Sequence, residues 1–236
     1  MIVPAACRRK SQSNDANINS TEVASDSAAD RSQARVLVEK GKQLYIGDKD
    51  SQAAEAFEHA VKLDPNLPEA HFRLGLTYDA LGKEQEAEIE YKKAVDTYKK
   101  YLRENPNDAE AHYNLGQTYA GLHLYSEAVR EYRQATKLKN DDADVYYDLG
   151  TALIKLAQYD EAVTAFSKSL EIDPENYRAE DSLAEAREGV QRISAGKKHQ
   201  LDLLKKQKAD ELKKGEGGSP ESPSTKPTPA KKPPEL

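Results

Sequence analysis

Two nearly identical stretches begin 41 residues apart in the sequence: EAHFRLGLTYDALGK (residues 69–83) and EAHYNLGQTYAGLHL (residues 110–124). Their glycines, Gly75 and Gly116, form a series with Gly41 and Gly150, in which successive members are 34, 41 and 34 residues apart. A fixed period in this range indicates a stacked repeat protein, in which each unit contacts only its neighbours. The 236-residue chain is therefore predicted to contain four similar units instead of one globular core.

Small and aromatic residues recur in the same register. An alanine, an aromatic ring four residues later and a small residue three after that form three columns: Ala53, Ala87, Ala128 and Ala162; Phe57, Tyr91, Tyr132 and Phe166; Ala60, Ala94, Ala135 and Ser169. Small residues let helices approach closely, so we expect Gly75 to face Ala87 within a unit. We expect the Tyr91 ring to fill the space between units. Three units end near a proline that stops the second helix: Pro65, Pro106 and Pro174.

This pattern resembles the tetratricopeptide repeat (TPR) family, whose ~34-residue helix–turn–helix unit carries the same leucine–glycine, tyrosine, alanine, phenylalanine and proline columns. The best single match is AHYNLGQTYAGLHLYSEAVREYRQATKL. The resemblance implies an all-α, right-handed α-solenoid of about four units with a C-terminal capping helix. The expected units are residues 34–67, which are degenerate, and residues 68–108, 109–142 and 143–176.

The spacing of 41 contains seven residues more than the period, and they lie in YKKAVDTYKKYLRENPND (residues 91–108). Nothing before Asn105 breaks a helix, and one apolar stripe runs unbroken from Tyr91 to Leu102. Seven residues make almost two helical turns, or about 10 Å. We therefore expect a second helix that is longer by two turns, and an inserted loop is the alternative.

The two ends of the chain have little apolar periodicity. Residues 1–33 and the proline-rich residues 215–236 are expected to be disordered. Residues 177–214 are expected to form the capping helix and a basic extension, with Tyr177, Leu183 and Ala184 contacting the last unit. The lysine-rich extension is interpreted either as a solvated helix end or as a helix for an anionic partner or membrane surface.

Cys7 is the single cysteine, so the chain has no internal disulfide and no cysteine-rich zinc site. VPAACRRK resembles the end of a bacterial lipoprotein signal, but the apolar stretch before Cys7 is too short for a signal peptide. Cys7 is therefore either a lipid anchor, if the true start lies upstream, or an incidental thiol. Membrane contact and a bacterial cell-envelope location are predicted only in the first case, and the default location is cytoplasmic.

The sequence contains no pattern typical of an active site. It has no phosphate-binding glycine loop, no His-Glu-x-x-His and no nucleophile paired with a base. His71 and His112 occupy equivalent places in successive units, where packing is a simpler explanation than a metal pair. We expect no enzyme activity, no cofactor and no metal site, and the net charge of −6 argues against a nucleic-acid partner.

Binding is then the expected activity. In the TPR family the first helices of successive units line a concave groove, and the resemblance places ten residues there: Phe72, Arg73, Leu76, Tyr113, Asn114, Gln117, Asp144, Tyr147, Asp148 and Thr151. The rings of this set are expected to lie one per layer beside acidic residues, which favours a peptide with apolar anchors and basic flanks. The family's carboxylate clamp is not expected, because only Asn114 matches its residues.

The predicted function is a non-catalytic scaffold that binds a protein or peptide segment in this groove. Two alternatives remain open from the sequence: a lipid-anchored assembly factor of the cell envelope, and a regulatory subunit of an enzyme.

Overall fold

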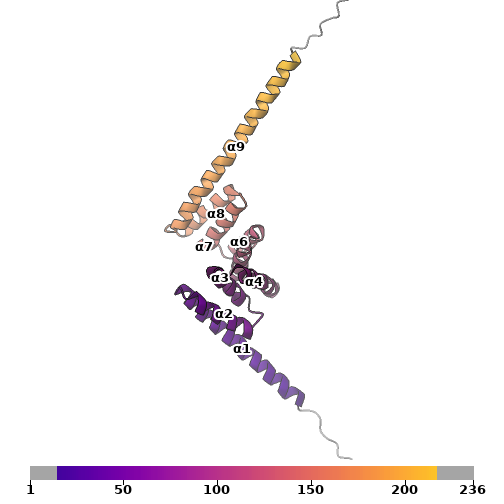
Figure 1. Ribbon diagram of the computed structural model, residues 1–236, viewed down its shortest axis with the longest axis vertical. Coiled ribbons are helices and arrows are strands. Elements are labelled where there is room, and N and C mark those ends of the chain that lie inside the picture. Colours follow the sequence, from indigo (N-terminus) through magenta and orange to yellow (C-terminus); the bar gives the residue numbers. More distant parts are fainter. Residues whose placement is uncertain (1–14, 217–236) are drawn as a thin grey trace, which may run out of the picture. The chain divides into compact units, whose positions relative to one another are not determined.

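The computed structural model describes residues 15–216, with side-chain surroundings for residues 27–212, and the regular elements in this range are all α-helices (Figure 1). Successive helices pair within each unit: α1 (Asp15–Ile46) with α2 (Asp50–Leu63), α3 (Pro68–Ala80) with α4 (Glu84–Glu104), α5 (Ala109–Gly121) with α6 (Tyr125–Leu138), and α7 (Ala143–Lys155) with α8 (Tyr159–Ile172). A further helix, α9 (Tyr177–Glu216), follows them. The expected all-α solenoid is confirmed.

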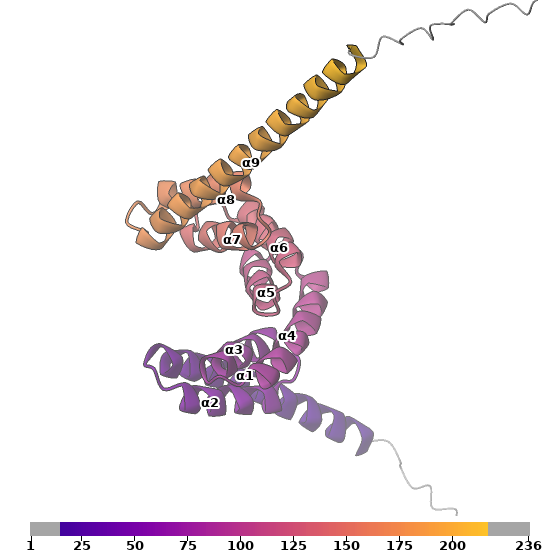
Figure 2. The same cartoon turned by 45° about the horizontal axis from the view of Figure 1, so that its top comes forward.

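The first helices of the units form an inner layer. Cα atoms of α1 and α3, of α3 and α5, and of α5 and α7 come within 8 Å of one another. No pair among α2, α4, α6 and α8 comes this close within the described part of the chain. Because the first helices are the more closely spaced, they lie on the concave side of the stack, and the second helices lie outside (Figure 2).

An aromatic ring packs directly on the repeat glycine in every unit. A Cβ atom added to Gly75 would lie 2.7 Å from Tyr91, and one added to Gly116 would lie 2.5 Å from Tyr132. The nearest side chain to Gly75 is therefore the Tyr91 ring, and the expected contact between Gly75 and Ala87 stays a prediction. Tyr91 also packs on Gly121 of the next unit, at 2.8 Å by the same measure, so it fills the space between units as expected.

The seven extra residues are helical. α4 has 21 residues, whereas α2, α6 and α8 have 14 each. Tyr98 in the added turns is buried in the core, and Tyr101 donates a hydrogen bond to Asp108 at 2.9 Å. Lys100 donates to the Asn66 side chain at 3.2 Å. The added turns are therefore held from both sides by the connections that precede α3 and α5.

The first helix is longer than its sequence suggested. α1 begins at Asp15 and has 32 residues, so the disorder expected for residues 15–33 is not what the structure has. No proline or glycine occurs between residues 15 and 40, and alanine, serine, glutamine and arginine all tolerate a helix. The packed turns around Ala34 and Val38 provide a nucleus from which the helix continues toward the N-terminus.

α9 begins as if it were the first helix of a fifth unit. Ala179, Leu183 and Ala186 are buried in the core cluster of the preceding units, and each lies 34 residues after a buried residue of α7. Tyr177 is 72% exposed and Ala184 is also exposed, so two of the three expected contacts were wrong. The structure divides after Arg187, and in the second part the side chains of residues 191–212 are exposed.

Some sequence predictions lie outside the described residues. Cys7 and residues 217–236 are among them, so the lipid anchor and the disordered tail stay predictions. Within the described range, no helix is both long and apolar enough to cross a membrane.

Candidate functional site

The three predicted groove rings do not share one environment. Phe72 is 0% exposed and belongs to the same buried cluster as Ala94 and Tyr98 of α4, so its assignment to the groove was wrong. Tyr113 and Tyr147, which occupy the same place in α5 and α7, are half-buried and pack at the edge of that cluster. Phe72 has no hydroxyl to keep in contact with water or a polar partner, and complete burial is therefore favourable for it.

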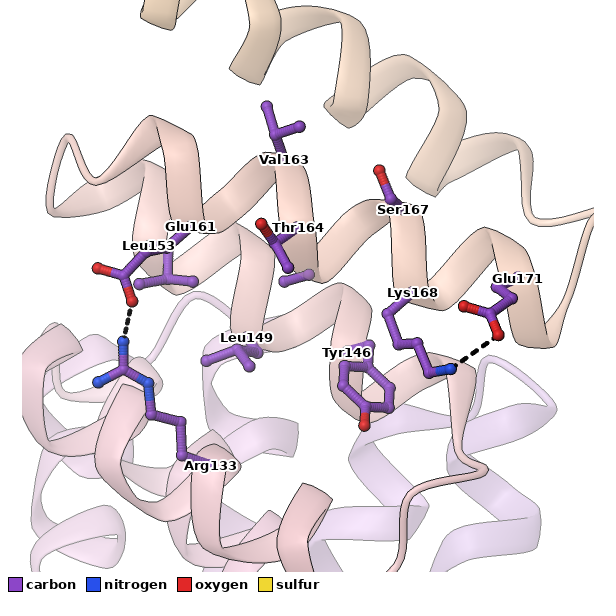
Figure 3. Close-up of a pocket in the computed structure, with 11 residues that line it drawn as sticks. Arg133, Tyr146, Leu149, Leu153, Glu161, Val163, Thr164, Ser167, Lys168 and Glu171 are labelled. Atoms are coloured by element: carbon purple, nitrogen blue, oxygen red, sulfur yellow. Dashed lines mark hydrogen bonds and ion pairs between the residues drawn. The ribbon is translucent and has the colours of Figure 1, made fainter.

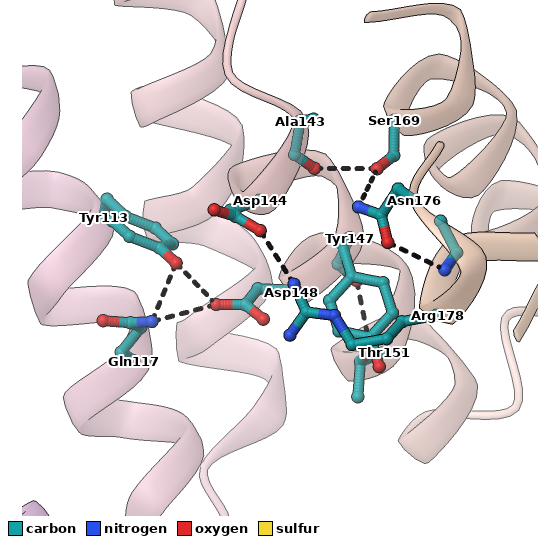
Figure 4. Close-up of polar contacts among 11 residues, drawn as sticks. Tyr113, Gln117, Ala143, Asp144, Tyr147, Asp148, Thr151, Ser169, Asn176 and Arg178 are labelled. Atoms are coloured by element: carbon teal, nitrogen blue, oxygen red, sulfur yellow. Dashed lines mark hydrogen bonds and ion pairs between the residues drawn. The ribbon is translucent and has the colours of Figure 1, made fainter. Parts of the chain in front are cut away.

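Tyr113, Gln117 and Asp148 form one hydrogen-bonded network between α5 and α7 (Figure 4). The Tyr113 hydroxyl donates to Asp148 Oδ2 at 2.9 Å, and Gln117 Nε2 donates to the same oxygen at 3.0 Å. Gln117 Nε2 also lies 2.8 Å from the Tyr113 hydroxyl. Burial raises the pKa of Asp148, and the hydrogen bonds from Gln117 and Tyr113 oppose that rise without reversing it. The sequence placed these residues correctly on one face but did not predict that they bind one another.

Arg178 of α9 covers the predicted groove at its C-terminal end (Figure 4). Its guanidinium carbon lies 4.8 Å from the centre of the Tyr147 ring, and its Nη2 donates to Asp144 at 3.0 Å. The repeat period could have revealed this residue, because Arg178 lies 34 residues after Asp144 in the column of Arg35, Glu69 and Glu110. Asp144 is thus already paired with a cation, and Tyr147 is less available to a partner than expected.

The remaining predicted residues have different surroundings. Arg73 lies over the Phe72 ring at 5.3 Å and pairs with Glu69 at 3.5 Å. Asn114 is 6% exposed, and Leu76 packs against the core cluster. The Thr151 hydroxyl donates to the Tyr147 carbonyl in its own helix at 3.1 Å.

A hollow of about 450 Å³ lies where several of these residues meet, and we call it the groove pocket. Its lining comes from α3, α5, α6, the connection after α6, and α7: Arg73, Ala109, Glu110, Tyr113, Asn114, Gln117, Ala135, Lys139, Asp142 and Val145. The sequence missed the Lys139–Asp142 pair, whose atoms are 3.2 Å apart. The connection after α6 has no proline, so the repeat columns did not identify this pair.

A second hollow, of about 620 Å³, is lined by residues of α6, α7 and α8 (Figure 3). Arg133 of α6 pairs with Glu161 of α8 at its edge, and Lys168 pairs with Glu171 at 2.9 Å. Leu149 and Leu153 form its apolar floor. None of the ten predicted groove residues lines this hollow.

The two aligned histidines have a structural role. His71 Nδ1 lies 2.7 Å from Glu90 Oε2 of its own unit, and His71 Nε2 donates to the Pro65 carbonyl at 3.0 Å. His112 repeats both contacts, with Glu131 at 2.8 Å and the Pro106 carbonyl at 3.2 Å. Each histidine thereby ties the start of a first helix to the second helix of the same unit. Among the described residues, no group of three potential metal ligands gathers at either ring.

Glu90→Gln should lower the free energy of unfolding by about 1.5–3 kcal/mol at neutral pH, because a buried charged hydrogen bond is lost. Burial opposes the ionisation of Glu90, but hydrogen bonds from His71 and Lys93 outweigh it and lower the pKa of Glu90 below its ordinary 4.5. A lowered folded-state pKa gives stability that is complete above pH 4.5 and is lost as pH falls through the folded value.

Urea denaturation at a series of pH values measures this effect. The wild type should lose more stability on acidification below pH 4.5 than Glu90→Gln does. Glu88→Gln, in the same helix, is the matched control, because Glu88 is exposed and pairs only with Lys92. Equal acid sensitivity of the wild type and Glu90→Gln would contradict the assignment.

Comparison with known families decides the identity of the chain. Tetratricopeptide repeat models match residues 66–141 and 143–176, and a TPR repeat model matches residues 41–82. The chain belongs to the tetratricopeptide repeat family. These matches cover residues 41–141 and 143–176, which include most of the groove-pocket lining, and the TPR family is typically non-enzymatic.

Solved TPR structures resemble this TPR chain in fold. A chain of the APC/C hetero-tetramer Cut9–Hcn1 is 22% identical, with a TM-score of 0.53, over 65% of this chain and 30% of that one. A MamA structure (AMB-1) is 23% identical, with a TM-score of 0.50, over 76% of this chain and 98% of that one. Another MamA crystal structure is 28% identical, with a TM-score of 0.49, over 76% and 94%. No curated protein matches this sequence.

Proposed function

We propose that this TPR protein is a non-catalytic scaffold that binds a peptide or partner segment in the groove pocket. TPR proteins bind protein or peptide partners, and the pocket lies among the closely spaced first helices. The observation that carries the proposal is a hollow of about 450 Å³ with both polar and apolar walls. Tyr113 and Gln117 provide oriented polar groups, whereas Ala109 and Val145 provide apolar surface.

The partner segment has apolar anchors and at least one basic flank. Asp144 and Asp142 are already paired with Arg178 and Lys139, and Asp148 is held by Tyr113 and Gln117. Glu110 lines the pocket, is exposed and has no ion pair within the described residues. A basic group of the partner is therefore expected beside Glu110, and not along the whole acidic column.

Gln117→Arg should reduce partner capture at least about tenfold while the protein stays folded. The longer side chain would fill the groove pocket and bring a guanidinium beside Asp148, so the buried carboxylate keeps a partner. The test is capture from a lysate of the native host on the immobilised full chain, with quantitative mass spectrometry of the bound proteins and a thermal melt of each variant.

Ser167→Arg is the matched control, because Ser167 is exposed and lines the other hollow. It should leave capture unchanged. Loss of capture in Ser167→Arg together with normal capture in Gln117→Arg would move the binding site to the outer face and overturn the proposal. Tyr113→Ala is less suitable, because the Tyr113 ring packs 5.9 Å from Tyr132 and its removal would also lower stability.

A further inference from the structure

The two added turns of α4 help to form a separate hollow of about 220 Å³, which we call the extension pocket. Tyr98 and Tyr101 of those turns line it, together with the first turns of α3 and α5 and Arg35 of α1. Glu110 and Asn114 line both this pocket and the groove pocket. A segment in the groove pocket is therefore next to the extension pocket, and one of its side chains can enter it.

The lining of these two pockets includes buried polar atoms that make no hydrogen bond. Within the described residues, three buried side-chain atoms lack a hydrogen bond: Glu69 Oε1, Arg73 Nε and the Tyr98 hydroxyl oxygen. Glu69 and Tyr98 line the extension pocket, and Arg73 lines the groove pocket. Glu69 Oε1 and Arg73 Nε lie 3.5 Å apart in an ion pair, so each of them has a charged partner. The Tyr98 hydroxyl has none among the described residues, and a buried polar group without a partner destabilises a folded protein unless a ligand satisfies it.

Tyr98 gives the clearest indication of a missing partner. Its side chain is 3% exposed, and no hydrogen bond joins its hydroxyl to another described residue. The Asn114 side chain lies close enough to act on the pKa of Tyr98 and lower it, but the contact does not have the geometry of a hydrogen bond. Burial raises the pKa of Tyr98 and the Glu69 carboxylate raises it further, so the hydroxyl stays protonated and is able to donate or accept.

The charges around the pocket favour a cation. Three carboxylates line it, those of Glu69, Asp108 and Glu110, against the single cation Arg35. Asp108 is occupied, because it accepts from the Tyr101 hydroxyl at 2.9 Å and from the Ala111 amide at 3.0 Å. Glu69 Oε1 lies 3.2 Å from Lys42 Nζ, outside the pocket lining. Glu110 is the carboxylate left for a ligand.

We propose that the extension pocket binds one basic side chain, lysine or arginine, of the partner segment. The cation pairs with Glu110 and donates to the Tyr98 hydroxyl, and the stem packs against the tyrosine rings. The biological context rests on the proposed function, since the groove pocket would hold the rest of the segment. In this interpretation the seven extra residues add a specificity pocket to one unit of the solenoid.

N-acetyl-arginine amide and N-acetyl-lysine amide, titrated into the isotope-labelled full chain and followed by NMR, test the site without any partner. Both should shift resonances of Tyr98, Tyr101 and Glu110, and N-acetyl-citrulline amide, which lacks the charge, should bind about tenfold more weakly. Glu110→Gln should weaken the binding of the cationic probes by about the same factor. Glu86→Gln, at an exposed position of α4 outside the pocket lining, should not.

Tyr98→Phe separates ligand binding from packing. The variant should melt at or slightly above the wild-type temperature, because its lost hydroxyl had no hydrogen bond to lose. It should nevertheless bind both cationic probes several-fold more weakly. Equal binding of citrulline and arginine probes, or unchanged binding in both Glu110→Gln and Tyr98→Phe, would overturn the proposal. The amide probes do not need the groove pocket, so their failure to bind as expected would overturn only the extension-pocket proposal. Normal partner capture by Gln117→Arg would instead count against the proposed function.

Discussion

Tyr91→Ala should lower the free energy of unfolding by about 3–5 kcal/mol, as expected for the loss of a fully buried aromatic ring. Tyr91 is 1% exposed and lies between Gly75 of its own unit and Gly121 of the next. The substitution removes the ring that packs against both units. Because a solenoid is stabilised by contacts between neighbours, the single unfolding transition should separate into two.

Urea denaturation followed by far-ultraviolet circular dichroism and by tyrosine fluorescence measures both effects. Tyr91→Phe is the control, because it keeps the ring and loses only the hydrogen bond from the hydroxyl to Asp79 at 2.6 Å. Tyr91→Phe should lower the free energy of unfolding by about 1 kcal/mol. A single transition in Tyr91→Ala, close to that of the wild type, would show that the ring does not couple the two units.

Gly116→Ala should lower the free energy of unfolding by about 1–3 kcal/mol, although alanine is the better helix former. The new methyl group would lie 2.5 Å from a ring carbon of Tyr132, whose side chain is 2% exposed. The ring cannot move away freely, because Tyr113 packs on it at 5.9 Å. Steric crowding therefore outweighs the gain in helix propensity.

Gly196→Ala should instead raise the stability of the helix that contains it. A methyl group at Gly196 in α9 would meet no atom within 4 Å, so the helix should gain up to about 1 kcal/mol from propensity alone. A double mutant tests the crowding. Tyr132→Leu should lower the free energy of unfolding less in the Gly116→Ala protein than in the wild type, because a shorter side chain relieves the contact. Simple additivity of the two substitutions would argue against crowding.

The repeat columns predicted the fold well because packing alone determines them. Each unit needs a residue without a side chain where an aromatic ring packs on the first helix, and this requirement recurs along the chain. The pairs Gly75–Tyr91 and Gly116–Tyr132 are two examples. The length of α4 was also predictable, since a continuous apolar stripe at helical spacing leaves no place for a loop.

The site was less predictable because exposure depends on neighbours that the columns do not describe. Phe72 shares a column with Tyr113, yet it is buried in one cluster with Tyr98 from the extra turns of α4. Arg178 lies beyond the last unit, and only its distance of one period from Asp144 connects it with the groove. Side-chain networks, such as the one around Asp148, depend on rotamers that the sequence alone does not specify.

The histidine ties described above have a consequence for synthesis on the ribosome. Each tie joins residues that are close in sequence: His71 contacts the Pro65 carbonyl six residues earlier and Glu90 nineteen residues later. The second tie has the same separations. A unit can therefore close as soon as its own second helix has left the exit tunnel, before the next unit is translated. The nascent chain would then acquire its structure one unit at a time, from the N-terminus onward.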